Sequence, residues 1–405
     1  MRFALLSVPW YNRPIMEDQQ SLPLPIWVDT EPGFRALLAH LRGEPALAVD
    51  TESNSLYVYR EQVCLIQISV PGADYLVDSL ALDDLSALGP ILADPDVVKV
   101  FHGAEYDASV LYRDFGFTVS SLFDTMWASR ILGWPAHGLA ALLKAHFGVH
   151  LNKKYQRANW GLRPLPAPQL DYARLDTHYL LPLREIQVRE LDAEDRWPQA
   201  RHRFAKVASA RGEPKEFDPN GFWKFDGVRE LDDAGRGALR ELYRYRDQLA
   251  RSENRPPFRV ISRQALIGLS KKRPSKRHEL HLIKGVSKRM AGRYGRGLLA
   301  AIRHGEGRPL AWRDRPRQSN NSSRKSNGRP SAACQARFES LRAWRNATAE
   351  ERGVEPDIIL TNSTLWAVAC RNPTSRADLS DGDMLAPWQV NEFGHDLLAV
   401  MRRAR

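Results

Sequence analysis

The sequence predicts an α/β domain built around a mixed sheet, followed by two small all-helical domains. Three observations predict this fold class. Short apolar runs alternate with segments of helical periodicity up to about residue 195, a helical pattern recurs in the C-terminal half, and a polar segment without periodicity separates its two copies. With 405 residues, the chain is long enough for each domain to bury a core of its own.

The elements of the first domain follow from residue type and spacing. The runs ALAVD, VCLIQISV, DYLVD and VVKVFHG are short and apolar, which indicates strands. Helical periodicity marks DDLSALGPILAD and AEYDASVLYRDFG, the second closed by Gly116, and three later segments at 124–132, 137–147 and 168–191. Strands that alternate with helices favour an α/β domain, in which functional groups gather at strand ends.

The C-terminal half contains an internal repeat with an offset of 99 residues. Without a gap, Arg246 aligns with Arg345, and apolar anchors, prolines and glycines align with them, for example Gly295 with Gly394. The two copies are therefore expected to share one small helical fold. Between them, RPRQSNNSSRKSNGRPSAA is polar and rich in Ser, Asn and Arg, which indicates a flexible linker.

These patterns set the predicted domain boundaries. Four prolines make the first residues irregular, and the breaker-rich piece at 211–222 ends the α/β domain. The prediction is an irregular N-terminal segment at 1–25, the α/β domain at 26–200, a connector at 201–230, a first helical domain at 231–308, a linker at 309–333 and a second helical domain at 334–405.

Composition limits the compartment and the kind of cysteine chemistry. No apolar run approaches the roughly 20 residues of a membrane-spanning helix, and FALLSV near the start is shorter than a secretory signal requires. We therefore expect a cytoplasmic protein with no membrane partner. Cys64, Cys334 and Cys370 are far apart and lack metal-ligand spacing, so we expect reduced thiols rather than a disulfide framework or a zinc site.

The net charge of +11 is unevenly placed along the chain. Residues 1–200 carry −8, whereas residues 201–405 carry +19. This division is expected if one part holds cations and the other holds a polyanion. Nucleic-acid binding is the favoured interpretation, and a solvated basic surface that keeps the protein in solution is the alternative.

Four acidic residues and one tyrosine lie at the ends of predicted strands or on predicted helices. Asp50 and Glu52 follow a buried strand two residues apart, so their side chains share a face and repel each other unless a cation lies between them. Asp107 comes in the first turn of the helix after VVKVFHG, while Tyr172 and Asp176 are four residues apart on one helix face. Each taken alone has an ordinary explanation as a helix-dipole or surface residue.

Together, these residues resemble the DEDD exonuclease superfamily in its tyrosine subclass. The segments FHGAEYDASVLYRDFG, FDTMWASRILG and KKYQRANWGLRPLPAPQLDYARLDTHYLLPL are similar to ribonuclease D in particular. The two C-terminal repeats resemble the helicase-and-RNase-D C-terminal (HRDC) domain, which ribonuclease D can carry in tandem. The resemblance implies a ribonuclease H-like exonuclease domain followed by two HRDC-like domains, and the second repeat departs most from the family pattern.

The resemblance also implies a function and a site. It implies a metal-dependent 3′→5′ exoribonuclease that releases nucleoside 5′-monophosphates and trims the 3′ ends of structured RNA such as tRNA precursors. We expect a monomer. Two divalent cations, Mg²⁺ or Mn²⁺, suit a set of carboxylates. Their ligands would be Asp50, Glu52, Asp107 and Asp176, and Tyr172 would orient the attacking water. A DNA exonuclease and a catalytically silent RNA-binding protein remain alternatives.

Four further residues are weaker candidates. His102 is more simply a structural group, and Asp124 most simply caps the helix that begins at residue 125. Gln156 and Trp160, in the basic segment KKYQRANW, could reach substrate, although Trp160 could equally anchor the core. The many Lys and Arg residues of the first repeat are expected to include phosphate contacts, with a solvated face as the alternative.

Overall fold

The structure is a computed structural model that describes residues 22–316 and 330–403. Most of the expected irregular segment at 1–25 and of the expected linker at 309–333 lies outside these residues. The chain forms two compact units. One unit contains the α/β domain and the second repeat, and the other contains residues 53–62 and the first repeat.

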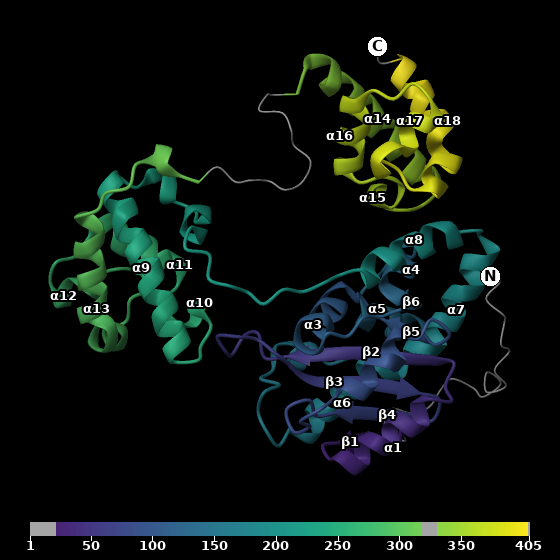
Figure 1. Ribbon diagram of the computed structural model, residues 1–405, viewed down its shortest axis with the longest axis horizontal. Coiled ribbons are helices and arrows are strands. Elements are labelled where there is room, and N and C mark those ends of the chain that lie inside the picture. The colour runs from purple at the N-terminus through teal and green to yellow at the C-terminus, as the bar shows by residue number, and fades with distance from the viewer. Residues whose placement is uncertain (1–21, 317–329, 404–405) are drawn as a thin grey trace. The chain divides into compact units, whose positions relative to one another are not determined.

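Within the described residues, six strands form one mixed sheet, which confirms the predicted fold class of this domain. Their order across the sheet is β1-β4-β3-β2-β5-β6, and it can be followed in Figure 1. Strands β3 and β4 are antiparallel, whereas β1 with β4, β2 with β5 and β5 with β6 are parallel. The strands are β1 (Ile26–Val28), β2 (Ala46–Ser53), β3 (Val63–Val70), β4 (Ala73–Val77), β5 (Val98–Phe101) and β6 (Leu122–Asp124).

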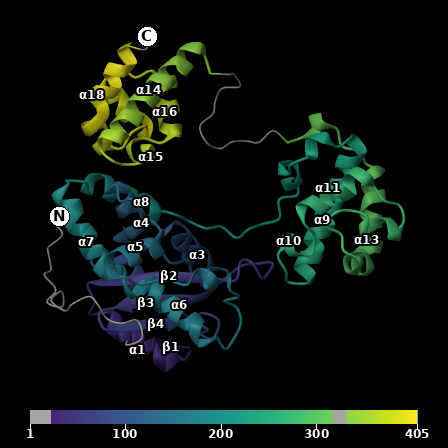
Figure 2. The same ribbon diagram turned by 180° about the vertical axis from the view of Figure 1, so that it is seen from behind.

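Helices cover this sheet, and α6 packs on β3 and β4, as the view from behind shows (Figure 2). The helix expected over 168–191 is two helices, because Tyr179, with φ −95° and ψ 2°, interrupts it. The helix expected over 83–94 is a short 3₁₀ turn followed by α2. The helices of this domain are α1 (Glu31–Leu41), α2 (Gly89–Ala93), α3 (Glu105–Phe115), α4 (Thr125–Ile131), α5 (Leu139–Phe147), α6 (Ala167–His178), α7 (Leu180–Ala193) and α8 (Trp197–Ala208).

Asp124 ties two elements together at the strand ends. Its carboxylate accepts hydrogen bonds from the backbone N–H of Met126 and Trp127, so it caps α4 as the sequence predicts. The same carboxylate accepts from the N–H of Gly103 and Ala104, at 3.0 and 2.9 Å. Because α3 begins directly after these residues, Asp124 also fixes the helix that carries Asp107.

The two repeats have the same helical fold, each built around a long first helix. The buried Arg246 donates to the carbonyl of Ile261 and the buried Arg345 to the carbonyl of Leu360, so donor and acceptor are both offset by 99 residues. The first repeat contains α9 (Asp233–Ser252), α10 (Pro257–Val260), α11 (Arg263–Lys272), α12 (Arg277–Leu280) and α13 (Lys288–Glu306). The second contains α14 (Ala332–Glu351), α15 (Pro356–Ile359), α16 (Asn362–Arg371), α17 (Arg376–Ser380) and α18 (Pro387–Arg403).

The expectation of three reduced thiols is wrong for two of them. Cys334 on α14 and Cys370 on α16 form a disulfide, with their Cα atoms 5.0 Å apart. The packing of α14 against α16 brings together two residues that are 36 positions apart in the sequence. Cys64 is buried and takes no part in this disulfide.

The second repeat contacts the α/β domain within the first unit through charged side chains. Arg130 on α4 pairs with Glu355 and Asp357, which lie at the start of α15. Gln199 on α8 donates to Glu392 on α18 at 2.9 Å. None of the helices in the described parts of the chain is long and apolar enough to cross a membrane.

Candidate active site

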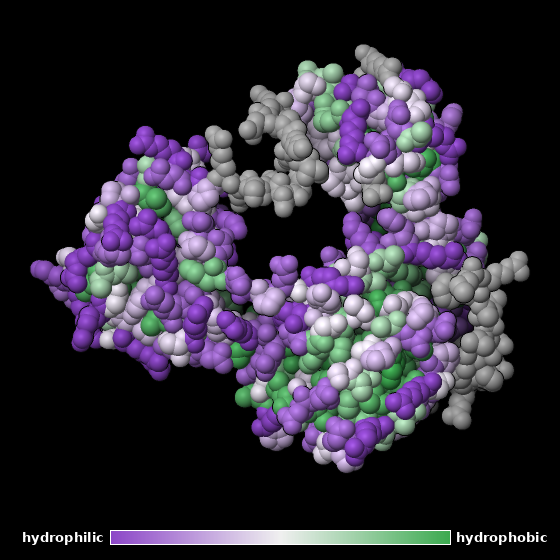
Figure 3. Space-filling view, in the orientation of Figure 1, coloured by the Kyte–Doolittle hydropathy of each residue, from purple (hydrophilic) through white to green (hydrophobic). Residues whose placement is uncertain are grey.

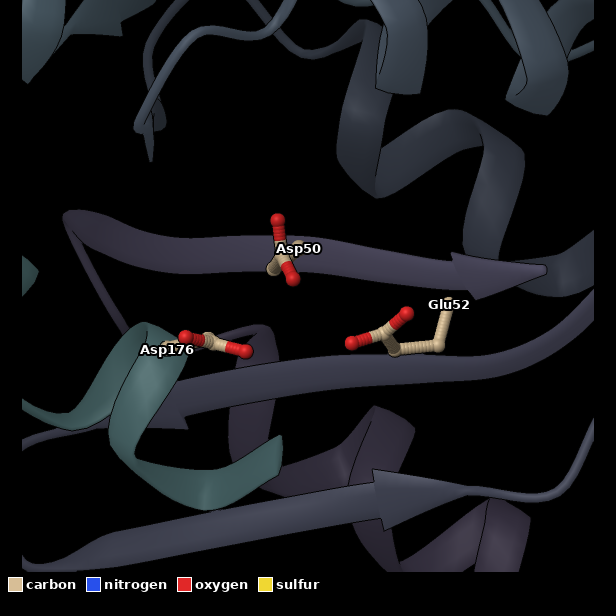
Figure 4. A group of neighbouring side chains, drawn as sticks. All are labelled: Asp50, Glu52 and Asp176. Carbon is tan, nitrogen blue, oxygen red and sulfur yellow. The ribbon is translucent and has the colours of Figure 1, made fainter. Parts of the chain in front are cut away.

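Three carboxylates meet where β2 passes the end of α6. Asp50 and Glu52 lie on the same face of β2, as their spacing predicts, and Asp176 comes from the last turn of α6. One carboxylate oxygen from each lies within 4.8 Å of the other two. Figure 4 shows Glu52 and Asp176 directed toward each other beside Asp50.

Asp107 lies beside this group but has a hydrogen-bond partner of its own. It is in the first turn of α3, and its Oδ1 accepts a hydrogen bond of 2.5 Å from the hydroxyl of Thr51. Thr51 stands between Asp50 and Glu52 on β2, so its side chain leaves the opposite face of the strand. The hydroxyl therefore fixes Asp107 relative to the same strand that carries the other two acids.

Burial and mutual repulsion perturb these acids in one direction. Burial, followed by the neighbouring carboxylates, raises the pKa of Asp50 and of Glu52 well above their usual values. Burial raises the pKa of Asp107 to about 6, against the opposing effect of the Thr51 hydrogen bond. Burial also raises the pKa of Asp176 to about 8. Without a cation these acids therefore tend to keep their protons, and a bound cation would favour their ionised form.

Tyr172 lies one turn before Asp176 on α6 and is itself buried. Its hydroxyl donates a hydrogen bond to the Asp176 carboxylate. Burial and then the nearby carboxylates raise the pKa of Tyr172 above its usual value, so the hydroxyl stays protonated at neutral pH. A protonated phenol can hold and orient a water molecule but does not act as a base.

The acids open into a cavity of about 520 Å³. Gln156 and His102 line it, although the sequence favoured a purely structural role for His102. Lys153, which no sequence pattern marks as a site residue, lines the cavity too. Burial lowers the pKa of His102 to about 4, so the imidazole is neutral. Trp160 is buried against Tyr172, with ring centroids 6.1 Å apart, which favours its reading as a core anchor. The cavity lining is Asp50, Glu52, His102, Gly138, Leu139, Ala140, Ala141, Leu151, Lys153, Gln156, Tyr172 and Asp176.

The donor set fits a hard divalent cation. Carboxylate oxygens are the ligands that Mg²⁺ and Mn²⁺ prefer. Among residues 22–316 and 330–403, Asp50, Glu52 and Asp176 are the one group of acids, histidines or cysteines placed closely enough to share an ion. The charges that act most strongly on Asp50 are all carboxylates, so a positive charge is favoured beside it.

Comparison with known proteins agrees with this geometry. Residues 25–192 match the protein family described as 3′-5′ exonuclease, and residues 236–302 and 335–401 match the HRDC domain. A ribonuclease D from Gluconacetobacter diazotrophicus is 30% identical over 385 residues, which span 93% of this chain and 93% of that protein. This chain belongs to the ribonuclease D family. The resemblance predicted from the sequence is therefore confirmed.

The chain is also similar to a second exonuclease in sequence and to a solved structure in fold. The exosome complex exonuclease RRP6 of Saccharomyces cerevisiae is 35% identical over 64% of this chain, but the chain spans only 38% of that protein. The structure also aligns with the crystal structure of Escherichia coli RNase D, with a TM-score of 0.65 and 22% sequence identity. The alignment covers 94% of this chain and 99% of the Escherichia coli chain. At that identity, the likeness shows the shared fold, including the two helical domains after the α/β domain.

Proposed function

We propose that this chain is a metal-dependent 3′→5′ exoribonuclease that removes nucleoside 5′-monophosphates from structured RNA, with tRNA precursors as one substrate class. The observation that carries the proposal is the group of three carboxylates within 4.8 Å of one another at the wall of a cavity, with Tyr172 hydrogen-bonded to one of them. Membership of the ribonuclease D family supports it.

In this proposal, two divalent cations, Mg²⁺ or Mn²⁺, occupy the site. Asp50, Glu52 and Asp176 would hold one ion, and Asp50 with Asp107 would hold the second. Bound divalent cations polarise a phosphodiester and lower the pKa of water. The Tyr172 hydroxyl donates a hydrogen bond to Asp176, so its oxygen is left to accept a hydrogen bond from the attacking water and to aim that water at phosphorus.

The RNA body is proposed to bind the first HRDC domain rather than the second. Residues 231–308 carry 20 Lys and Arg against 7 Asp and Glu, a net charge of +13, whereas residues 334–405 carry 9 against 10, a net charge of −1. In Figure 3, the visible face of the first HRDC domain is largely hydrophilic. A polyanion favours the basic domain, because each phosphate that a Lys or Arg contacts releases counterions.

The second HRDC domain has a different environment. Its acidic residues Glu355 and Asp357 are paired with Arg130 of the exonuclease domain, and Glu392 binds Gln199. These contacts support a role in packing against the exonuclease domain.

A DNA exonuclease is the competing enzyme, since the same acids can act on either sugar. The 2′-hydroxyl distinguishes the two substrates. The deciding experiment compares the release of mononucleotides from single-stranded RNA and DNA of the same sequence, with Mg²⁺ present. Faster release from RNA supports the proposal, and equal or faster release from DNA would contradict it.

A further inference from the structure

The hairpin of β3 and β4 places a buried polar cluster directly beside the end of α6. Ser69 on β3 and Asp74 on β4 are paired across the hairpin, and the Ser69 hydroxyl donates to Asp74 Oδ1 at 2.6 Å. Ser69 Oγ also lies 2.7 Å from the hydroxyl of Thr177, and His178 Nδ1 lies 2.8 Å from Asp74 Oδ2. We call these four residues the hairpin cluster.

Three of the four residues of the hairpin cluster are buried, and the side chain of the fourth, His178, is 24% exposed. Ser69 and Thr177 are each 1% exposed, and Asp74 is 8% exposed. Thr177 and His178 directly follow Asp176, so two consecutive residues of α6 are hydrogen-bonded to the hairpin. Buried hydrogen bonds of this kind hold one geometry, because breaking one leaves a polar group without a partner.

The same strand also contacts the other side of the carboxylate group. Gln67 precedes Ser69 by two residues, so both side chains leave the same face of β3. Gln67 is fully buried, and its Nε2 donates to Asp50 Oδ2 at 3.4 Å. One face of β3 is thus connected to Asp50 through Gln67 and to the end of α6 through Ser69.

We infer that Gln67 and the hairpin cluster are positioning residues that set the distance between Asp50 and Asp176. This inference rests on the proposed function, because it takes those two carboxylates as ligands of the same cation. The two acids come from elements far apart in the sequence, and at 4.8 Å or less their charges repel each other. Without the hydrogen bonds of Gln67 and the hairpin cluster, β2 and α6 would move apart at this point. Each cation that binds would then have to bring Asp50 and Asp176 together again.

The test measures cation binding directly, on the metal-free full-length protein, from the Mn²⁺ signal in electron paramagnetic resonance. Thr177→Val keeps the shape of the side chain but removes the hydroxyl that meets Ser69, whereas Thr177→Ser keeps the hydroxyl. We expect Thr177→Val to weaken Mn²⁺ binding about tenfold, as loss of a group that orients a ligand commonly does, and Thr177→Ser to bind like wild type.

Two further variants test the contact of Ser69 with Thr177 and the contact of Gln67 with Asp50. Ser69→Ala should weaken Mn²⁺ binding, and combining it with Thr177→Val should add little, since both remove the same contact. Gln67→Met keeps the side-chain length without the donor and should add its effect to that of Thr177→Val, because it acts through Asp50. Ser270→Ala is the matched control: Ser270 is fully buried and donates to the Leu266 carbonyl in the first HRDC domain.

The outcomes separate this inference from the proposed function. If wild type binds no Mn²⁺ at the carboxylates, the proposed function fails. If wild type binds Mn²⁺ and Thr177→Val binds it within twofold of wild type, only the positioning role fails. A lowered unfolding temperature in Ser69→Ala and Ser270→Ala alike, with Mn²⁺ affinity unchanged in both, also overturns the positioning role, because the cluster would then only stabilise the fold.

Discussion

Replacing Asp176 by Asn should stabilise the metal-free protein. Asp176 is one of three carboxylates within 4.8 Å of one another, and two charges at that distance repel by roughly 3 kcal/mol at an effective dielectric constant of about 20. Burial raises the pKa of Asp176 from 3.8 to about 8, so the folded state holds a proton that the unfolded chain releases at neutral pH. This linkage costs at most about 4 kcal/mol at pH 7.

The sign of the pH dependence follows from the raised pKa. The contribution of Asp176 to stability is fully present below about pH 4 and is lost as the pH rises toward 8. Asn does not titrate, so Asp176→Asn should match wild type near pH 4 and exceed it by about 2–4 kcal/mol near pH 8. For a domain of this size, the unfolding temperature should rise by roughly 5–15 °C.

Scanning calorimetry with chelator or with Mg²⁺ measures this difference. Mg²⁺ should raise the unfolding temperature of wild type at pH 8, because it binds only the folded carboxylates, but should leave Asp176→Asn nearly unchanged. Asp171→Asn is the matched control on the same helix, since Asp171 is 54% exposed and pairs with Arg174 at 3.1 Å. If metal-free Asp176→Asn unfolds at or below the wild-type temperature near pH 8, the buried Asp176 carboxylate does not destabilise the folded protein.

Three other predictions follow from named contacts. Tyr172→Phe should lower kcat on single-stranded RNA roughly a hundredfold, as loss of a group that handles the attacking water does, and leave Mn²⁺ affinity within a few-fold of wild type; a parallel loss of Mn²⁺ binding would contradict the orienting role. Cys334→Ser should lower the free energy of unfolding of the second HRDC domain in urea by about 3–4 kcal/mol, as expected when a disulfide that closes a loop of 36 residues is lost. Cys64→Ser is the control outside the disulfide and should not lower the unfolding free energy of this domain. Replacing the exposed Lys271 and Lys272 by Ala should reduce the salt dependence of binding to structured RNA by one to two ion equivalents, roughly, and replacing the exposed Arg402 and Arg403 should change it less; an equal effect would place RNA on both domains.

Most of the fold could be predicted from local pattern. The run VCLIQISV forms β3 with the predicted bounds, because seven of its eight residues are apolar or small, which suits a strand that is buried throughout. The repeat is visible for a similar reason: its anchors are buried side chains such as Arg246 and Arg345, each at the same place in its copy. Fold class and family therefore follow from features that the sequence carries within one element or one copy.

What escaped prediction depends on tertiary contacts. Strands β1 and β6 have three residues each, too few to show alternation. The break between α6 and α7 falls at Tyr179, where neither Pro nor Gly marks it. The disulfide joins Cys334 to Cys370 only because α14 packs on α16.

The acidic residues of the site could be predicted from the sequence, but the residues that hydrogen-bond to them could not. The spacing of Asp50 and Glu52 after an apolar run indicated two carboxylates on one face of a strand. The spacing of Tyr172 and Asp176 indicated a pair on one face of a helix. The hydroxyl of Thr51 and the amide of Gln67 reach those acids only across the folded sheet. The sequence around a buried Thr or Gln does not indicate which carboxylate its side chain will contact in the folded protein.

We propose above that these carboxylates hold cations that promote hydrolysis of RNA from its 3′ end. A 5′-labelled RNA hairpin with a single-stranded 3′ tail, incubated with Mg²⁺ or with chelator, tests it most directly for wild type and Asp50→Asn. We expect wild type with Mg²⁺ to give a ladder that shortens from the 3′ end, and no ladder with chelator or with the variant. Shortening that survives in Asp50→Asn, or binding without any shortening by wild type under Mg²⁺ or Mn²⁺, would contradict it.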